Sequence, residues 1–492
     1  SCPECQDAPD MIDARIDEAR RGAVERAHAF SPFLRMALQQ LPEIEAVFTA
    51  AGSAAAIATA LQPRDGPVGE ILRQERHALA LAIALGDLAG ELSLEEVTRA
   101  LSDHADSAID RALRAAVAER VPEAPLAGMA VLALGKLGSR ELNYSSDVDL
   151  ILIFDPDDLP RRERDEAGEA AVRYGRRMIE LLQQRTEHGY VARVDMRLRP
   201  SPEVTPIALP VDAAISYYES SALPWERAAF IRARACAGDL ELGQRFLREI
   251  QPFIWRRALY FGAIQEIRDS SLRIRDHYAQ GQGFGPGFDL KRGRGGIREA
   301  EFFTQVQQLI HGGRDPSLRL PATLDALAAL KAADRLAPEQ ALAVADAYRA
   351  LRTAEHRVQM IADKQEHRLP EDSFLDQVAR LDGRRDGSAL LDLLRPHVEQ
   401  VGALFDGLVG ETSERLSNDP MVLRTELVQL GLSAPDEGVR RIAEWRSGRA
   451  RSLRSPAARN AFEAMLPNLL RAVAEGPDAN RALNRFGDIV EK

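Results

Sequence analysis

The sequence is short of several features that would assign it to a specialised class of protein. It has only three cysteines, Cys2, Cys5 and Cys236, which excludes a disulfide-stapled scaffold. Cys2-Pro-Glu-Cys5 is half of a zinc knuckle whose second half the sequence lacks, so we expect a flexible tail there. No apolar run approaches the ~20 residues that span a membrane, and no signal-peptide pattern opens the chain. A cytoplasmic protein with no membrane partner is therefore expected.

An excess of positive charge is also absent. The 492 residues include 64 Lys and Arg against 75 Asp and Glu, which gives a formal net charge of −11. Proteins that bind nucleic acid are more often basic, so we expect no nucleic-acid partner. The chain does have 45% hydrophobic residues and an abundance of Ala, Leu and Arg, and these residues favour helices. A chain of this length typically folds as several domains.

One segment interrupts an otherwise helical pattern. Short apolar runs at Met129–Leu134 and Asp147–Phe154 have the length of buried strands. Tyr190–Leu198 alternates apolar and polar residues, which predicts a half-buried strand with a charged face. We therefore predict a predominantly helical chain of the α+β class. Its expected parts are a helical region at 1–120, an α+β domain at 121–237, a helical domain at 238–410 and a helical connector at 411–492.

Three aspartates in the α+β segment are candidates for metal binding. Asp147 and Asp149 begin the second strand, and alternation places both carboxylates on one face. Two ionised carboxylates this close repel each other unless a cation lies between them, and hard oxygen ligands suit Mg²⁺, with Mn²⁺ as the alternative. Asp195 lies on the later strand between Arg193 and Arg197. Such a carboxylate set suits a displacement at phosphorus. The alternatives are a solvated strand end for the first pair and simple arginine pairing for Asp195.

Two glycine-containing segments are candidates for binding phosphate. Gly135-Lys136-Leu137-Gly138-Ser139 follows the first strand. Its spacing is not that of a P-loop, but glycines there let backbone N–H groups approach a phosphate. In the segment 289–301, Lys291 and Arg298 are among four cations interleaved with three glycines, a composition that suits a phosphate or a nucleotide. The alternatives are an ordinary turn and a surface loop whose arginines pair with nearby acids.

The order of these features resembles that of the DNA polymerase beta-like nucleotidyltransferases. The segments LGKLGSRELNYSSDVDLILIFD, RVDMRLRP, WERAAFIRARACAGD and DLKRGRGGIREAEFFTQ resemble the glutamine synthetase adenylyltransferase/adenylyl-removing enzyme family. The resemblance implies a nucleotidyltransferase domain embedded between helical regions. It implies catalytic and metal-binding roles for Asp147, Asp149 and Asp195. It also implies that substrate or phosphate binds at Gly135, Gly138, Ser139, Ser146, Arg197, Arg199, Lys291, Arg298, Glu299 and Glu301.

Members of this family carry two catalytic halves, whereas this chain has one Gly-Ser/Asp-x-Asp set and so resembles one half. NYSSDVDL, VDMRLRP and GGIREAEF resemble the amino-terminal, adenylyl-removing half, because the other half has a glycine before its Ser-Asp and Thr in place of Met196. The resemblance implies phosphorolysis of adenylylated glutamine synthetase, with inorganic phosphate as co-substrate and ADP as product. It also implies regulation by the PII signal protein in its uridylylated form. Three alternatives stay open. The chain could transfer an adenylyl group from ATP, or be a non-catalytic fragment that binds glutamine synthetase or PII. The third alternative is an RNA nucleotidyltransferase, which the net charge disfavours.

Overall fold

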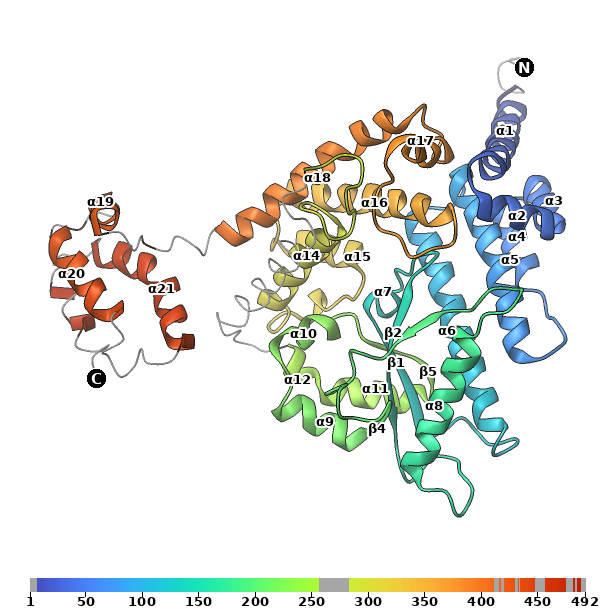
Figure 1. Cartoon of the computed structure of the whole chain (residues 1–492), viewed down its shortest axis with the longest axis horizontal. Coiled ribbons are helices and arrows are strands. Elements are labelled where there is room, and N and C mark those ends of the chain that lie inside the picture. The colour runs from blue at the N-terminus through green and yellow to red at the C-terminus, as the bar shows by residue number, and fades with distance from the viewer. Residues whose placement is uncertain are drawn as a thin grey trace. The chain divides into compact units, whose positions relative to one another are not determined.

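The computed structural model describes residues 7–255 and 283–410 and, beyond them, 416, 420–429, 432, 434–446, 456–474, 481–482 and 485–487. The chain divides into two compact units, Ser1–Ala403 and Leu404–Lys492, which are described separately (Figure 1). The first unit contains the sheet and most of the helices. The finer boundaries expected from the sequence within this unit stay predictions.

The N-terminal part of unit 1 is an array of helices. They are α1 (Asp7–Phe30), α2 (Pro32–Gln40), α3 (Pro42–Ala51), α4 (Ser53–Ala60), α5 (Val68–Ala89) and α6 (Leu94–Ala118). Side chains set the helix starts. Ser31 caps α2 by accepting a hydrogen bond from the Leu34 N–H, and Ser93 and Glu96 form a capping box at α6. The apolar faces of the first five of these helices pack into a buried cluster that includes Phe48.

Five short strands form the sheet. They are β1 (Met129–Leu134), β2 (Asp147–Phe154), β3 (Arg193–Asp195), β4 (Ala208–Pro210) and β5 (Arg234–Gly238). The order is β3-β2-β1-β5, and β4 also pairs with β2. β1 is antiparallel to β2 and β5, whereas β3 and β4 are parallel to the two ends of β2. This mostly helical chain with a small mixed sheet confirms the predicted fold class.

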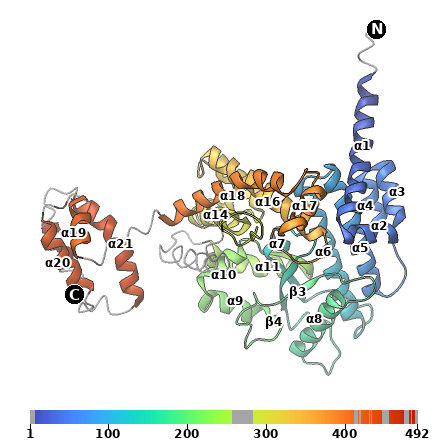
Figure 2. The same cartoon turned by 45° about the horizontal axis from the view of Figure 1, so that its top comes forward.

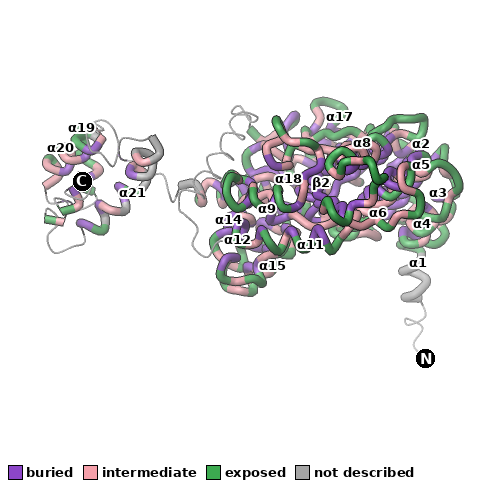
Figure 3. The backbone as a smooth tube through the Cα atoms, turned by 90° about the horizontal axis from the view of Figure 1, so that it is seen from below, coloured by how far each residue is buried: buried purple, intermediate pink, exposed green. Residues whose placement is uncertain are grey.

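Helices cover both faces of the sheet, as Figure 2 shows for α6 and α8 on one side and α9 to α11 on the other. The elements added here are α8 (Ala167–Gln183), α9 (Val211–Ser220), α10 (Pro224–Phe230), α11 (Leu240–Glu249) and α12 (Gln251–Ile254). Successive strand residues face opposite cores: Val131 packs with α6 and α8, and Leu132 packs with α9 to α12. The sheet is therefore buried on both faces (Figure 3), which explains why β1 is wholly apolar.

The remainder of unit 1 is helical again. Its elements are α14 (Ile297–His311), a 3₁₀ turn at Pro316–Leu318, α15 (Thr323–Ala332), α16 (Pro338–Met360), α17 (Asp372–Leu381) and the part of α18 (Gly387–Gly410) that ends at Ala403. A loop at residues 287–296, called the Lys291 loop below, precedes α14. Backbone hydrogen bonds join it to the segment after α16: the Leu290 N–H donates to the His367 carbonyl (2.8 Å), and the Leu369 N–H donates to the Phe288 carbonyl (2.9 Å). The loop is thus part of the folded unit.

Unit 2 is a small helical bundle with its own core. Its described helices are α19 (Pro420–Gln429), α20 (Pro435–Arg446) and α21 (Pro456–Ala474). Trp445 is buried at its centre, with ring centroids 5.5 Å from Phe462 and 5.6 Å from Phe486 in edge-to-face arrangements, the favoured geometry for aromatic pairs.

The structure corrects the strand predicted at Tyr190–Leu198. Only its centre pairs as β3, because the N–H groups of Val191 and Ala192 donate instead to the Leu182 carbonyl of α8 (both 3.0 Å). Tyr190 and Val191 are both buried, so the predicted alternation fails there. Cys2 and Cys5 lie outside the described residues. In the described part of the chain, no helix is both long and apolar enough to cross a membrane.

Candidate active site

The parallel pairing of β2 and β3 brings the three predicted aspartates together. Asp149 lies directly opposite Asp195, and Asp147 lies opposite Arg193. Neighbouring strands are ~4.8 Å apart, so the Asp149 and Asp195 carboxylates project side by side. Asp147 projects from the same face of β2 because it is two residues away. Asp149 and Asp195 are therefore neighbours at one edge of the sheet, and Asp147 lies on the same side of β2.

The surroundings affect Asp149 and Asp195 in opposite ways. Burial raises the pKa of Asp149 to about 6, the charges of Asp195 and Asp147 add to this rise, and Lys291 opposes it. Burial would also raise the pKa of Asp195, but hydrogen bonds from Arg197 outweigh it and hold that pKa below its ordinary value. The Nε of Arg197 lies 3.0 and 2.8 Å from the two carboxylate oxygens. Asp149 is therefore the carboxylate at this edge that would gain most from a bound cation.

Two side chains hold Asp147 in place. Arg193 Nε donates to Oδ1 (2.7 Å), and Gln365 Nε2 donates to Oδ2 (3.1 Å). Arg193 also donates to the Tyr190 hydroxyl (2.5 Å) and to the Ser145 carbonyl (3.1 Å). The Asp147 carboxylate is thereby oriented both by β3 and by the segment that follows α16.

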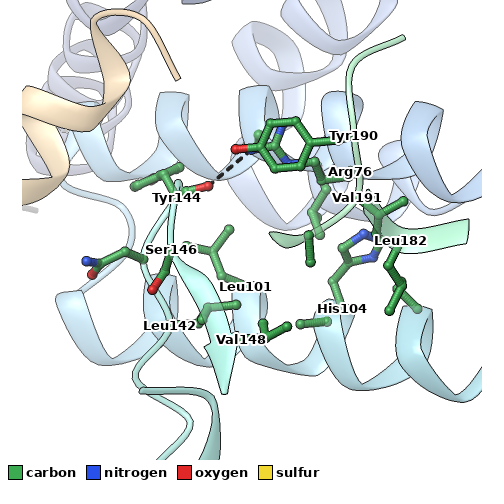
Figure 4. Close-up of a pocket in the computed structure, with 16 residues that line it drawn as sticks. Arg76, Leu101, His104, Leu142, Tyr144, Ser146, Val148, Leu182, Tyr190 and Val191 are labelled. Carbon is green, nitrogen blue, oxygen red and sulfur yellow. Dashed lines mark hydrogen bonds between the residues drawn. The ribbon is translucent and has the colours of Figure 1, made fainter. Parts of the chain in front are cut away.

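A small cavity lies beside the start of β2 (Figure 4). Arg76 lines it, donating to the Tyr144 carbonyl (3.3 Å) and lying with its guanidinium 4.6 Å from the centre of the Tyr190 ring. His104 contributes a buried Nε2 with no hydrogen-bond partner among the described residues. The cavity volume is about 40 Å³, which is enough for a few water molecules and too little for a nucleotide. The cavity is therefore not the substrate site.

The glycine turn between β1 and β2 lies against Asp149. Gly135 opens α7 (Gly135–Gly138) with φ +57°, and a Cβ at this position would overlap Asp149 Oδ2. A Cβ on Gly138 would overlap the Arg232 carbonyl. The hydroxyl of Ser139 donates to the Gly135 carbonyl (3.2 Å). The two glycines thus allow close packing of the turn, whereas Ser139 bonds within it.

The Lys291 loop approaches the aspartates from a distant part of the chain. Lys291 lies close enough to Asp149 for its charge to lower the pKa of that carboxyl. Asp289 shapes the loop, because its Oδ1 accepts from the N–H groups of Lys291 (3.0 Å) and Arg292 (2.8 Å). The Arg298 N–H donates to the Lys291 carbonyl (3.0 Å), which ties the loop to the first turn of α14.

Other predicted phosphate-binding residues have partners elsewhere. Arg199 donates to three carbonyls in the loop 196–205. Glu299 accepts a hydrogen bond from the backbone of the Lys291 loop (2.7 Å), and Glu301 pairs with Arg232 (3.1 Å). Ser146 donates to the backbone carbonyl of the next residue (3.1 Å). Substrate contacts by these residues stay predictions.

The carboxylate edge has the donor chemistry of a magnesium site. In the described part of the chain, no group of three or more His, Cys, Asp or Glu side chains is arranged to hold a metal ion. Asp147 and Asp195 form ion pairs with Arg193 and Arg197. The donors nevertheless fit a hard cation, because they are carboxylate oxygens and Asp149 is incompletely compensated. Mg²⁺ typically takes one or two carboxylates and completes its shell with water and phosphate oxygens. Asp149 and Asp195 would hold such an ion.

The sequence analysis missed a buried polar cluster behind α7. Lys136 Nζ lies 3.0 Å from the carboxylate of Glu355 on α16. Glu355 also accepts from Asn143 (2.8 Å) and lies 2.6 Å from His367 Nδ1. The signal in the sequence was weak: Glu355 and Arg352 lie on the face of α16 that helical periodicity assigns to the core, where charged residues are unusual.

Comparison with known proteins finds two family models and several curated relatives that are similar to this chain. Residues 23–249 match the family described as glutamate-ammonia ligase adenylyltransferase, and residues 263–409 match the family described as GlnD PII-uridylyltransferase. Bifunctional glutamine synthetase adenylyltransferase/adenylyl-removing enzymes are similar to the chain. The enzyme of Caulobacter vibrioides is 40% identical, and the match covers 96% of this chain and 51% of that enzyme. The enzyme of Mesorhizobium japonicum is 40% identical, and the match covers 94% of this chain and 50% of that enzyme. The chain therefore spans about half the length of these curated relatives. Over most of its length the chain is therefore similar to about half of a bifunctional glutamine synthetase adenylyltransferase/adenylyl-removing enzyme.

Proposed function

We propose that this chain removes AMP from adenylylated glutamine synthetase by metal-dependent phosphorolysis, giving ADP and the unmodified enzyme. The observation that carries the proposal is the pairing of Asp149 with Asp195 on parallel strands, with Lys291 close to Asp149. Carboxylates that hold a cation, next to a lysine, suit transfer of a phosphorus-containing group between two oxygen atoms. The names of the relatives supply glutamine synthetase as the macromolecular substrate.

In the proposed reaction, an oxygen of inorganic phosphate attacks the adenylyl phosphorus. The bond from that phosphorus to the tyrosine oxygen breaks, and the phenolate leaves and takes a proton from water. The pKa of a tyrosine is near ~10, so the leaving group needs little help from an acid. Mg²⁺ held by Asp149 and Asp195 would supply charge neutralisation at the transferring group.

The chain's own residues take the remaining roles. We assign Lys291 to offset the repulsion between the incoming phosphate and the adenylyl phosphate. Arg193 and Gln365 would keep the Asp147 carboxylate oriented. Gly135 would leave room for the Asp149 carboxylate close to the backbone. Contacts of the substrate with Arg197 and Arg298 belong to the same proposal.

The direction of the reaction follows from the nucleophile. Water would need a positioned general base, whereas inorganic phosphate is already anionic. The described side chains at this edge are carboxylates of the metal-binding type together with the cations Lys291 and Arg197, and this combination favours phosphate. The resemblance of the sequence around Met196 to the adenylyl-removing half points the same way. Regulation by the uridylylated PII protein is part of the proposal.

The test is a single incubation of adenylylated glutamine synthetase with this chain and Mg²⁺, with and without phosphate, followed by chromatography of the nucleotides. We expect ADP to appear only when phosphate is present. An Asp147→Asn variant is the inactive control. AMP as the product would reject phosphorolysis in favour of hydrolysis. Incorporation of AMP from ATP into unmodified glutamine synthetase would assign the opposite activity to this chain.

A further inference from the structure

Two elements from distant parts of the sequence flank the Asp149 carboxylate. Gly135 at the start of α7 touches it from one side, and Lys291 acts on it from another. A phosphate that binds next to the aspartates needs both elements at a fixed spacing, because electrostatic stabilisation depends on donors that are already in place. One buried residue contacts a side chain of α7 and also a side chain of the segment that holds the Lys291 loop.

That residue is Glu355, whose side chain is 0% exposed. One side of its carboxylate faces the glycine turn: Lys136 Nζ lies 3.0 Å from Oε2 and 3.3 Å from Oε1, and Lys136 is the second residue of α7. Asn143, in the loop that follows the turn, donates to Oε2 (2.8 Å). Glu355 therefore anchors the connection between β1 and β2.

The other side of the carboxylate faces the support of the Lys291 loop. His367 Nδ1 lies 2.6 Å from Glu355 Oε1. The carbonyl of this histidine accepts from the Leu290 N–H (2.8 Å), and the bridge between Asp289 and Arg368 continues the pairing. His367 thus links the two: its side chain contacts Glu355, and its backbone carbonyl holds Leu290, the residue before Lys291.

Charge strengthens this link. Burial alone would raise the pKa of Glu355, but the charge of Lys136, the hydrogen bond from His367 and the charge of Arg352 outweigh it and keep that pKa well below its ordinary value. A buried ionised carboxylate is costly unless its partners stay in contact with it. Departure of Lys136 or His367 would therefore be penalised, which makes the carboxylate a stiff connection between the two elements.

We propose that Glu355 is a positioning residue that fixes the spacing between α7 and the Lys291 loop, and so forms the binding place of a phosphate group next to the adenylyl phosphorus. The inference rests on the proposed function, because it assigns the phosphate of that reaction to this place. Glu355 acts through Lys136 and His367 and makes no contact with the substrate.

The test compares the binding of AMP and ADP to the whole chain with Mg²⁺ by isothermal titration calorimetry. ADP carries, as its β-phosphate, the group that would enter as the nucleophile, so the ratio of the two affinities measures the phosphate site without turnover. Glu355→Gln keeps the size of the side chain and removes the charge that Lys136 and His367 share. We expect the Kd for ADP to rise about tenfold, equivalent to about 1.4 kcal/mol, and the Kd for AMP to change less than twofold.

Glu226→Gln is the matched control. Glu226 is also buried in unit 1, 3% exposed, but it accepts from the Leu223 N–H (2.6 Å) and caps α10. This variant should bind both nucleotides as the wild type does. Equal weakening of AMP and ADP by Glu355→Gln, or an unchanged affinity for ADP, would overturn the inference.

Two further measurements keep the outcomes separate. If Glu355→Gln does not fold, His367→Gln replaces it, since His367 lies at the edge of the cluster; it must then show the same selective loss of ADP binding, and unchanged binding would count against the proposal. ADP release by the wild type is scored independently. Failure of that release together with a selective loss of ADP binding would reject the reaction but retain the positioning role.

Discussion

Asp149 and Asp195 show how two identical side chains on paired strands acquire different energetics. Arg197 compensates Asp195 and lowers its pKa in spite of partial burial. The pKa of Asp149 is raised from 3.8 to about 6 by burial and by its acidic neighbours. A carboxyl whose pKa is higher in the folded than in the unfolded state opposes folding when it is ionised. The penalty is complete above about pH 6 and disappears as the pH falls through 6 towards 3.8.

Replacement of Asp149 by Asn should therefore stabilise the metal-free chain while abolishing turnover. The expected gain in the free energy of unfolding at pH 7 is about 1–3 kcal/mol, from a pKa difference of about two units. It should shrink as the pH falls below 6 and be small near pH 4, because Asp149 is then protonated in the folded state and partly protonated in the unfolded state. Urea denaturation in EDTA between pH 4 and pH 8 measures this difference. Added Mg²⁺ should stabilise the wild type and not Asp149→Asn, because only the native wild type offers the paired carboxylates.

Asp195→Asn is the control at the opposite strand position. It removes the pair with Arg197 and should give no gain in stability at any pH in the same range. Equal stabilisation of both variants would contradict the opposite pKa shifts of Asp149 and Asp195. If neither lost turnover, the proposed metal site would be wrong.

At the scale of an element, α7 couples backbone conformation to the position of a carboxylate. Gly135 has φ +57° and its missing Cβ leaves room for Asp149 Oδ2. Gly135→Ala should lower stability by about 1–2 kcal/mol, because non-glycine residues pay this strain in the left-handed region. It should also lower turnover more than tenfold, because the methyl group displaces the Asp149 carboxylate. Thermal unfolding and initial rates measure the two effects.

Gly90 offers a matched control for that substitution. It ends α5 with φ +74°, and a Cβ there would meet nothing within 4 Å. Gly90→Ala should therefore lower stability by a similar amount and leave turnover unchanged. A similar loss of activity in both variants would mean that turnover follows stability and not the position of Asp149.

Elements differ in how far the sequence alone could reveal them. β1 and β2 were predictable because a strand covered on both faces must be apolar throughout. β3 was predicted too long, because tertiary hydrogen bonds to the end of α8 compete with strand pairing. The Asp149–Asp195 pair could be anticipated from residue type and alternation. Gln365 could not, since no local pattern marks a glutamine in a loop that happens to reach Asp147.

At the scale of the whole molecule, the candidate site depends on contacts between remote parts of unit 1. Lys136 and Glu355 are separated by 219 positions, and they meet only because α16 packs behind the sheet domain. A sequence pattern shows local periodicity. It does not show which turn a charged residue on a buried helix face will contact. A candidate site could therefore be proposed from the sequence, whereas the contacts that hold its framework could not be predicted.

The division into two units predicts that they unfold separately. Unit 2 has its own core around Trp445. The part of α18 up to Ala403, with the buried Leu394 and Val398, belongs to unit 1. A chain that stops after residue 410 keeps all of α18, so we expect the thermal transition of unit 1 to move by less than about 3 °C while the transition reported by Trp445 is lost. Calorimetry and tryptophan fluorescence of the two chains measure this.

A second truncation, after residue 386, is the informative counterpart because it also removes α18. The Val398 carbonyl lies where a Cβ on Gly295 would be, so α18 packs directly against the Lys291 loop. Without that helix, Gly295 and its neighbours lose buried contacts, and unit 1 should melt well below the wild type and bind ADP more weakly. Equal melting of both truncated chains would show that α18 contributes nothing to unit 1. Independent cooperative units unfold separately. A large fall in the melting temperature of unit 1 after truncation at residue 410 would therefore mean that the two units are energetically coupled.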